Sequence, residues 1–333
     1  MLRLQFVLFQ MDEARRLIDE AHLSALRLAL LLLDNAAEVL LDRWTASSLM
    51  LDGVDRRLQA SARSWGASAN DPTLADLFSR TPLNARQVRN IARFFDEKIA
   101  YATTKSALSP SVGSALSHLH RYRNRAHHHA DVNEQTLRTS VIILFELCCQ
   151  LVLTLKPGMI GHSSREDYSW LQRRFGAGPG AFWDDARLQE ALDSMRVGLP
   201  ISDASLGQTL ADNLLSRIDE VLESLDFLVN TAQVEMNQSD VLAAAQGHAL
   251  DAVQQDPPYE SIPKGLELPV SVAELDAISL AAQHVASSPD CVSAVVAFAE
   301  PDKRLERVEF MVDGLARAVD EMIQNEVDAA LGK

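Results

Sequence analysis

A short cationic string near the middle of the chain carries side chains suited to acting on a phosphodiester. It reads Arg121-Tyr-Arg-Asn-Arg-Ala-His-His-His129, three arginines followed by three adjacent histidines. Arginine keeps its charge and offers a planar fork of donors to phosphate oxygens. Histidine exchanges protons near neutral pH. Such residues can cleave RNA without a metal, because one activates the ribose 2′-hydroxyl while the other stabilises charge on the phosphate.

Helical geometry limits which arginine and histidine of this string can cooperate. Arg123 and His128 are five positions apart, which places them about 140° apart around an ideal helix. This pair therefore needs a helix that ends or bends between them, or a second subunit that completes the site. His127 shares the face of Arg123 better, and Arg121 with His127 is a further pair.

The elements around the string are predicted to be helices. Apolar residues recur at three- and four-residue steps from Leu17 to Val39. Ser109 and Pro110 begin the helix that runs towards the histidines, and Asp131 or Asn133 caps the next. No segment alternates with period two, so the predicted fold class is all-α. The expected helices cover about residues 12–46, 73–79, 84–104, 110–128, 133–155, 164–174, 183–197, 203–254 with a break, 271–287 and 303–330.

Two segments resemble the HEPN domain family. Arg123-Asn-Arg-Ala-His-His128 resembles its signature of an arginine, a polar residue, three further positions and a histidine. Leu33-Asp-Asn-Ala-Ala-Glu-Val-Leu-Leu41 resembles the Asp-Asn-Ala…Glu pattern of its long first helix. The motif also precedes one last apolar helix, as in that family. The resemblance covers about residues 12–157 and favours the pair Arg123 and His128, because only this pair places Asn124 directly after the arginine.

The resemblance implies an antiparallel helical bundle, usually a homodimer with the two motifs facing each other. Many members are metal-independent ribonucleases in toxin–antitoxin, phage-defence or RNA-processing systems, and others bind RNA, nucleotides or proteins without cutting. It implies that Arg123 stabilises the scissile phosphate and that His128 is the acid and base. Asn124 would hold the substrate or the arginine. The substrate-binding residues expected beside them are Arg121, Arg125 and His127.

Metal binding is the main alternative chemistry for this region. His118 and His120 lie close to the string, but on a helix they diverge by about 200°. Zinc needs nitrogen or sulfur ligands that converge at about 2 Å, and no cysteine pair is nearby. We therefore expect neither a metal nor another cofactor. Ala130 replaces the tyrosine that one HEPN branch carries two residues after the histidine, so its modification is not expected here.

Charge divides the chain into two regions. Residues 1–157, the predicted HEPN-like bundle, hold 19 Lys+Arg and 16 Asp+Glu, so +3. Residues 158–333 hold 12 and 30, so −18, and the sum is the net charge of −15. We expect this second region to be helical, with an irregular connector near 255–270. It would recognise a partner such as an antitoxin or regulatory protein, a substrate or a trigger. An alternative hypothesis is that this acidic region covers the cationic site of residues 1–157.

Cysteine usage and hydropathy indicate the compartment. Three cysteines, two of them adjacent, do not make a disulfide framework, so a reducing cytoplasm fits best. The longest apolar stretch, Val141 to Leu155, is interrupted by Glu146 and Gln150. It is too short to span a bilayer, and no secretory signal is recognised. The sequence predicts a soluble cytoplasmic protein without a membrane partner.

Overall fold

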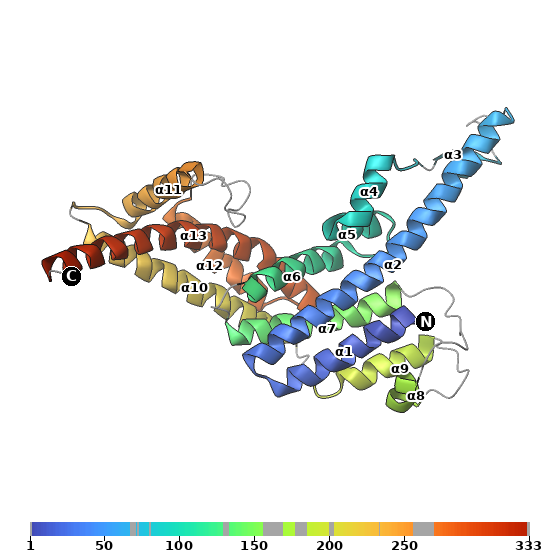
Figure 1. Cartoon of the computed structure of the whole chain (residues 1–333), viewed down its shortest axis with the longest axis horizontal. Helices are drawn as coiled ribbons and strands as arrows, with labels where there is room; N and C mark the ends of the chain where they lie inside the picture. Colours follow the sequence, from blue (N-terminus) through green and yellow to red (C-terminus); the bar gives the residue numbers. More distant parts are fainter. Residues whose placement is uncertain are drawn as a thin grey trace. The chain divides into compact units, whose positions relative to one another are not determined.

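The computed structural model describes residues 2–66, 71, 73–79, 81–128, 133–155, 169–176, 185–199, 203–232, 234–255 and 270–331. Every regular element in these ranges is an α-helix, which confirms the predicted all-α class (Figure 1). The chain forms two compact units, Met1–Ile201 and Ser202–Lys333, each with its own core. The predicted connector is not described, because residues 256–269 lie outside these ranges.

In the first unit, α1 and α2 form a helical hairpin and α7 packs against both. Helix α6 packs on α2 and α7, while α5 joins α6 to α2 and α4. The N-terminal part of α2 thereby meets the C-terminal half of α6. The antiparallel bundle of the HEPN family stays a prediction. The helices are α1 (Leu2–Glu20), α2 (Leu23–Ser64), α3 (Ala75–Ser79), α4 (Ala85–Arg93), α5 (Phe95–Thr104), α6 (Pro110–His128), α7 (Glu134–Thr154), α8 (Ser169–Phe175) and α9 (Asp185–Arg196).

Two predicted helices are each divided in the structure. The prediction of one continuous helix over 12–46 is wrong, because the chain turns at Ala21, whose φ is 55°. Helix α2 then begins anew, with the His22 side chain accepting from the Ala25 amide at 3.1 Å. Apolar periodicity continues across this turn, since both arms of the hairpin bury one face. The helix expected over 84–104 is divided by the extended backbone of Phe94. The segment before residue 12, which no expected helix covers, belongs to α1 from Leu2 onward.

Helix α7 is the core of the first unit. Asn133, one of the two caps expected, accepts from the Thr136 amide at 3.0 Å, while Asp131 lies outside the described residues. The helix has 21 residues and is long and apolar enough to cross a membrane by composition. The stretch Val141 to Leu155 is thus mostly part of this longer helix, and 78% of the helix's apolar window is buried. Burial around its whole circumference is typical of a core helix.

Helix α9 extends the first unit beyond residue 157, where the HEPN-like region was predicted to end. Arg196 donates to both carboxylate oxygens of Glu146 on α7, at 2.7 and 2.9 Å. Arg15 of α1 donates to the carbonyls of Met195 and Val197 at the end of α9, both at 3.0 Å. These bonds fix α9 to the hairpin and to α7. The predicted boundary at residue 157 lies within residues 156–168, which are outside the described ranges.

The second unit holds α10 (Asp203–Thr231), α11 (Gln238–Gln255), α12 (Val272–Ala286) and α13 (Cys291–Ala330). Arg217 of α10 donates to both oxygens of Glu309 at 2.6 and 2.7 Å and to Asp302 at 2.6 Å. The helix expected from residue 303 begins twelve residues earlier, because Asp290 caps it through the Ser293 amide at 2.8 Å. It also continues through Pro301.

Helices α10 and α12 approach closely at Gly207. A Cβ atom on this residue would lie 2.8 Å from the Val285 carbonyl oxygen. We predict that Gly207→Ala lowers the free energy of unfolding of the second unit by about 1–3 kcal/mol, because backbone must move. Gly247→Ala is the control, since its Cβ meets nothing within 4 Å in α11, and alanine there should stabilise the helix by about 1 kcal/mol. Equal changes in both variants, measured by urea unfolding, would contradict the packing constraint.

Candidate functional site

Asp34 is a charged residue within the buried face of α2. Its neighbours on that face include Leu33, Ala36 and Ala37, and Asp34 itself is only 2% exposed. A buried carboxylate is costly unless it is paired and hydrogen-bonded. The folded unit therefore requires cationic or donor groups at this point, and α6 supplies them.

Arg123 of α6 is the main partner of Asp34. Its Nε donates to Asp34 Oδ2 at 2.7 Å, and its Nη2 forms an ion pair with the same oxygen. Its Nη1 donates to the Asn124 side-chain oxygen at 2.6 Å. Three of the five N–H groups of the guanidinium are thereby engaged. No described residue accepts from the remaining two, and the side chain is 24% exposed, so the outer edge of the guanidinium can reach a ligand.

His120 lies one turn before Arg123 and also contacts Asp34. Its Nδ1 is 2.9 Å from Asp34 Oδ1, and because a carboxylate only accepts, Nδ1 carries the proton. The ring stacks on Phe95 of α5, with centroids 4.2 Å apart and planes at 26°. In the neutral ring Nε2 is then an acceptor, and no described residue bonds to it. The geometry is that of a histidine oriented for proton transfer.

Glu38 stands one turn after Asp34 on α2, at the edge of the cluster. Its Oε1 is 3.9 Å from both His120 Nδ1 and Arg123 Nη2. The cluster of Asp34, Glu38, His120 and Arg123 contains two carboxylates and one guanidinium. Its net charge is therefore −1 when His120 is neutral and zero when His120 is protonated. An anionic ligand at Arg123 is therefore favoured by protonation of His120.

Asp34, Glu38 and His120 also form a donor set of the kind that binds metals. One ligand atom from each lies within 4.8 Å of the other two. However, Asp34 already accepts from Arg123 on one oxygen and from His120 on the other. A cation would have to displace both donors. His118, the other histidine weighed as a ligand, is buried and only 5% exposed, and it does not belong to this donor set.

The other expected site residues are spread around α6. Arg121 is exposed and donates to the Ser117 carbonyl at 3.3 Å. The Arg125 guanidinium lies 5.4 Å from the Tyr122 ring centroid, and His127 is exposed. The helix continues to His128, whose side chain lies outside the described residues. Since the helix does not end between Arg123 and His128, the backbone directs the two about 140° apart.

Sequence reasoning did not find most of the cluster. Asp34 and Glu38 were quoted within a pattern but given no role, and His120 was weighed only as a metal ligand. Phe95 was not considered. The signal available was Asp34 itself, a charged residue inside a stripe of leucines and alanines that must be buried. Its partner could not be identified from spacing, because Arg123 is 89 positions away.

Comparison of this chain with protein-family models, with curated proteins and with solved structures finds no match. The HEPN resemblance therefore rests on its residues and stays a prediction. The contact between Asp34 and Arg123 joins the two segments on which it was based, Leu33–Leu41 and Arg123–His128. Neither segment specifies that contact by itself.

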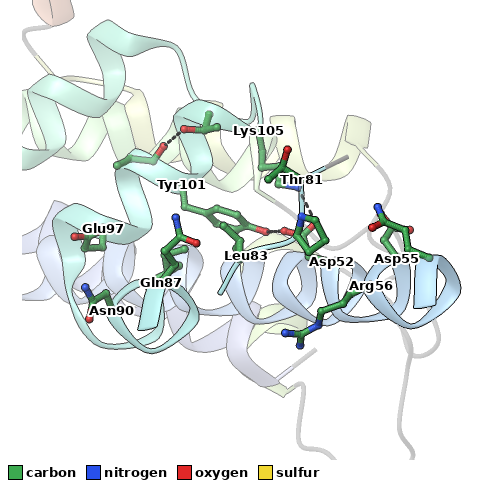
Figure 2. Close-up of a pocket in the computed structure, with 15 residues that line it drawn as sticks. Asp52, Asp55, Arg56, Thr81, Leu83, Gln87, Asn90, Glu97, Tyr101 and Lys105 are labelled. Atoms are coloured by element: carbon green, nitrogen blue, oxygen red, sulfur yellow. Dashed lines mark hydrogen bonds and ion pairs between the residues drawn. The ribbon is translucent and has the colours of Figure 1, made fainter. Parts of the chain in front are cut away.

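A separate cavity of about 600 Å³ lies between α2, residues 81–83 and helices α4 and α5 (Figure 2). On its wall the Tyr101 hydroxyl donates to Asp52 at 2.7 Å, and Lys105 Nζ pairs with the other oxygen of Asp52 at 2.7 Å. Ser48 Oγ is 2.9 Å from the same hydroxyl. These bonds tie α5 to α2 and thereby hold Phe95 near His120.

Replacing Asp34 tests whether this residue fixes the site. We predict that Asp34→Asn lowers the free energy of unfolding by about 3 kcal/mol, because Arg123 and His120 lose their shared carboxylate inside the fold. Glu13→Gln is the control, since Glu13 pairs with Arg16 on the surface of α1 and should contribute about 0.5 kcal/mol. The measurement is urea unfolding at neutral pH, and equal losses in the two variants would contradict the assignment.

Tyr101 should make stability depend on alkaline pH. Burial is the main cause that raises the pKa of this phenol to about 12, above its ordinary value of 10.0. Between these values the unfolded chain releases the proton while the folded chain keeps it, so stability falls as pH rises through the window. The difference in unfolding free energy between wild type and Tyr101→Phe, which removes this titration, should therefore shrink from pH 10 to 12. A constant difference would contradict the assignment.

Proposed function

We propose that the protein is a cytoplasmic, metal-independent endoribonuclease of the HEPN type, acting as a toxin or as a phage-defence or stress effector. It would cut RNA by attack of the 2′-hydroxyl and leave a cyclic phosphate. The observation that supports this most is the fixed guanidinium of Arg123. Asp34 and Asn124 hold one side of it, and two N–H groups remain for a phosphate oxygen.

In this proposal the proton-transfer group is His128 of a second subunit. Helix α6 directs Arg123 and His128 of one chain about 140° apart, so a homodimer that brings two α6 ends together would complete each site in trans. Asn124 keeps the guanidinium in place. Arg121, Arg125 and His127 would contact the RNA on either side. His120 is a second candidate for the acid and base, because Asp34 orients it beside Arg123.

The second candidate function is a HEPN-like module that binds RNA, a nucleotide or a protein without cutting. The observation that favours it is the pair of carboxylates beside Arg123, which leaves the cluster without positive charge when His120 is neutral. In either case the acidic region after residue 157 would engage an antitoxin, a regulatory protein or a trigger. Its charge of −18 would attract a basic partner.

Cleavage of labelled RNA in EDTA separates these functions. We predict that the wild type cuts under these conditions and that His128→Ala lowers the rate about 100-fold or more, as expected for a lost acid and base. Arg123→Lys should be similarly impaired, because lysine lacks the planar fork. Arg57→Ala, an exposed arginine of α2, is the matched control and should cut like the wild type.

The remaining outcomes assign the roles. Mixing the His128→Ala and Arg123→Lys proteins should restore part of the activity if the site is completed in trans. No cleavage by any protein would leave the binding module as the function, and cleavage abolished by EDTA would favour a metal at Asp34, Glu38 and His120. If His128→Ala keeps full cleavage activity and His120→Gln loses it, the acid–base role belongs to His120.

A further inference from the structure

Helix α4 presents three arginines on one face and no acidic residue at all. Its sequence is Ala-Arg-Gln-Val-Arg-Asn-Ile-Ala-Arg, and Arg86, Arg89 and Arg93 are all exposed. On an ideal helix these three positions fall within an arc of about 60°. The buried Ile91 lies roughly opposite, against the rest of the unit. We call these three side chains the α4 arginine row.

The charge balance around the α4 arginine row differs from that around several other arginines of the described residues. In this acidic protein Arg16, Arg196 and Arg217 all form ion pairs with carboxylates. No carboxylate of the described residues pairs with the α4 arginine row. Three neighbouring unneutralised cations form a local positive surface on a chain whose net charge is −15. Such a row attracts a polyanion.

An exposed aromatic ring stands at the end of this row. Phe94 follows Arg93 directly, its side chain is 48% exposed, and the Arg93 guanidinium lies 5.2 Å from the ring centroid. Its backbone is extended, with φ −105° and ψ 135°, which separates α4 from α5. An exposed phenyl ring beside arginines is a surface on which an unpaired base can stack.

The row also leads to the Arg123 cluster. Phe95, the residue after Phe94, stacks on His120, which contacts Asp34 together with Arg123. Consecutive Cα atoms are about 3.8 Å apart, so Phe94 is one residue from a wall of the cluster. Seven positions of helix separate Arg86 from Arg93 by about 10 Å along the axis of α4. Arginines, then an exposed aromatic ring, then a ring that contacts the cluster therefore follow one another along the chain.

We infer that the α4 arginine row and Phe94 form the binding surface for single-stranded RNA beside the scissile position. The arginines neutralise backbone phosphates, and Phe94 stacks one base next to the Arg123 cluster. The RNA must be single-stranded, because the bases of a duplex are already stacked and paired and cannot stack on Phe94. This inference rests on the proposed function for the site to which the strand is led. The binding itself requires no cleavage.

Binding of a fluorescent single-stranded 2′-O-methyl RNA tests the inference with the full-length protein. This probe lacks the attacking hydroxyl, so no variant can cut it, and anisotropy reports binding alone. The triple variant Arg86→Ala, Arg89→Ala, Arg93→Ala should bind more weakly. The slope of log K against log salt should become shallower by about 2, since three phosphate contacts at about 0.7 each are lost. The corresponding lysine triple variant should keep the wild-type slope.

Phe94 is tested by a matched pair of variants. Phe94→Ala should weaken binding about 10-fold through loss of one stacked base, and Phe94→Leu should be weakened similarly because leucine has no aromatic face. A paired duplex of the same sequence should bind the wild type more weakly than the single strand. The control triple variant replaces three exposed arginines of α2, Arg56, Arg57 and Arg63, with alanine and should bind like the wild type.

Several results would overturn the inference. These are wild-type binding by the α4 triple variant, equal weakening by the α2 control, or no binding by the wild type. Competition by polyglutamate as strong as by RNA, with no effect of Phe94→Ala, would assign the row to an acidic protein segment instead. Cleavage of ordinary RNA is measured in parallel. Binding through the row without any cleavage would reject only the ribonuclease, and cleavage with unchanged binding would reject only the row.

Discussion

The first unit depends on one buried charge. Asp34 lies inside the apolar face of α2, and its burial requires that α6 deliver Arg123 and His120 to it. Because α5 is fixed to α2 through Tyr101 and Asp52, Phe95 stacks on His120 at the same point. The Asp34 carboxylate therefore fixes α6 on α2 and leaves one edge of the Arg123 guanidinium accessible, while Asp52 holds α5 beside them.

Local signals predicted the helices well. Ser109 and Asn133 are caps in the structure as expected, and their bonds to the Val112 and Thr136 amides need only the next three residues. The interruptions at Ala21 and Phe94 were missed. Both occur where the chain turns to pack on itself, and apolar periodicity continues on each side. The start of the helix expected over 303–330 was also missed, since α13 begins at Cys291 and continues through Pro301.

The candidate site was only partly predictable. Arg123 and Asn124 were identified by residue type and spacing, and they do contact each other. The partners of Arg123 were not identified, because Asp34 comes from a helix almost ninety positions earlier and pairing of that kind depends on packing. Spacing also indicated that Arg123 and His128 diverge on a helix, and α6 is helical through both. The proposed function therefore places His128 of a second chain beside Arg123.

A double-mutant cycle between Asp34 and Arg123, read out as the rate of RNA cleavage, tests the central claim most directly. The variants are Asp34→Asn, Arg123→Lys and the two combined, each compared with the wild type in EDTA. If Asp34 acts by holding Arg123, the double variant should be no slower than Arg123→Lys alone, so the effects are strongly non-additive. Losses that multiply, or cleavage untouched by either change, would contradict the account.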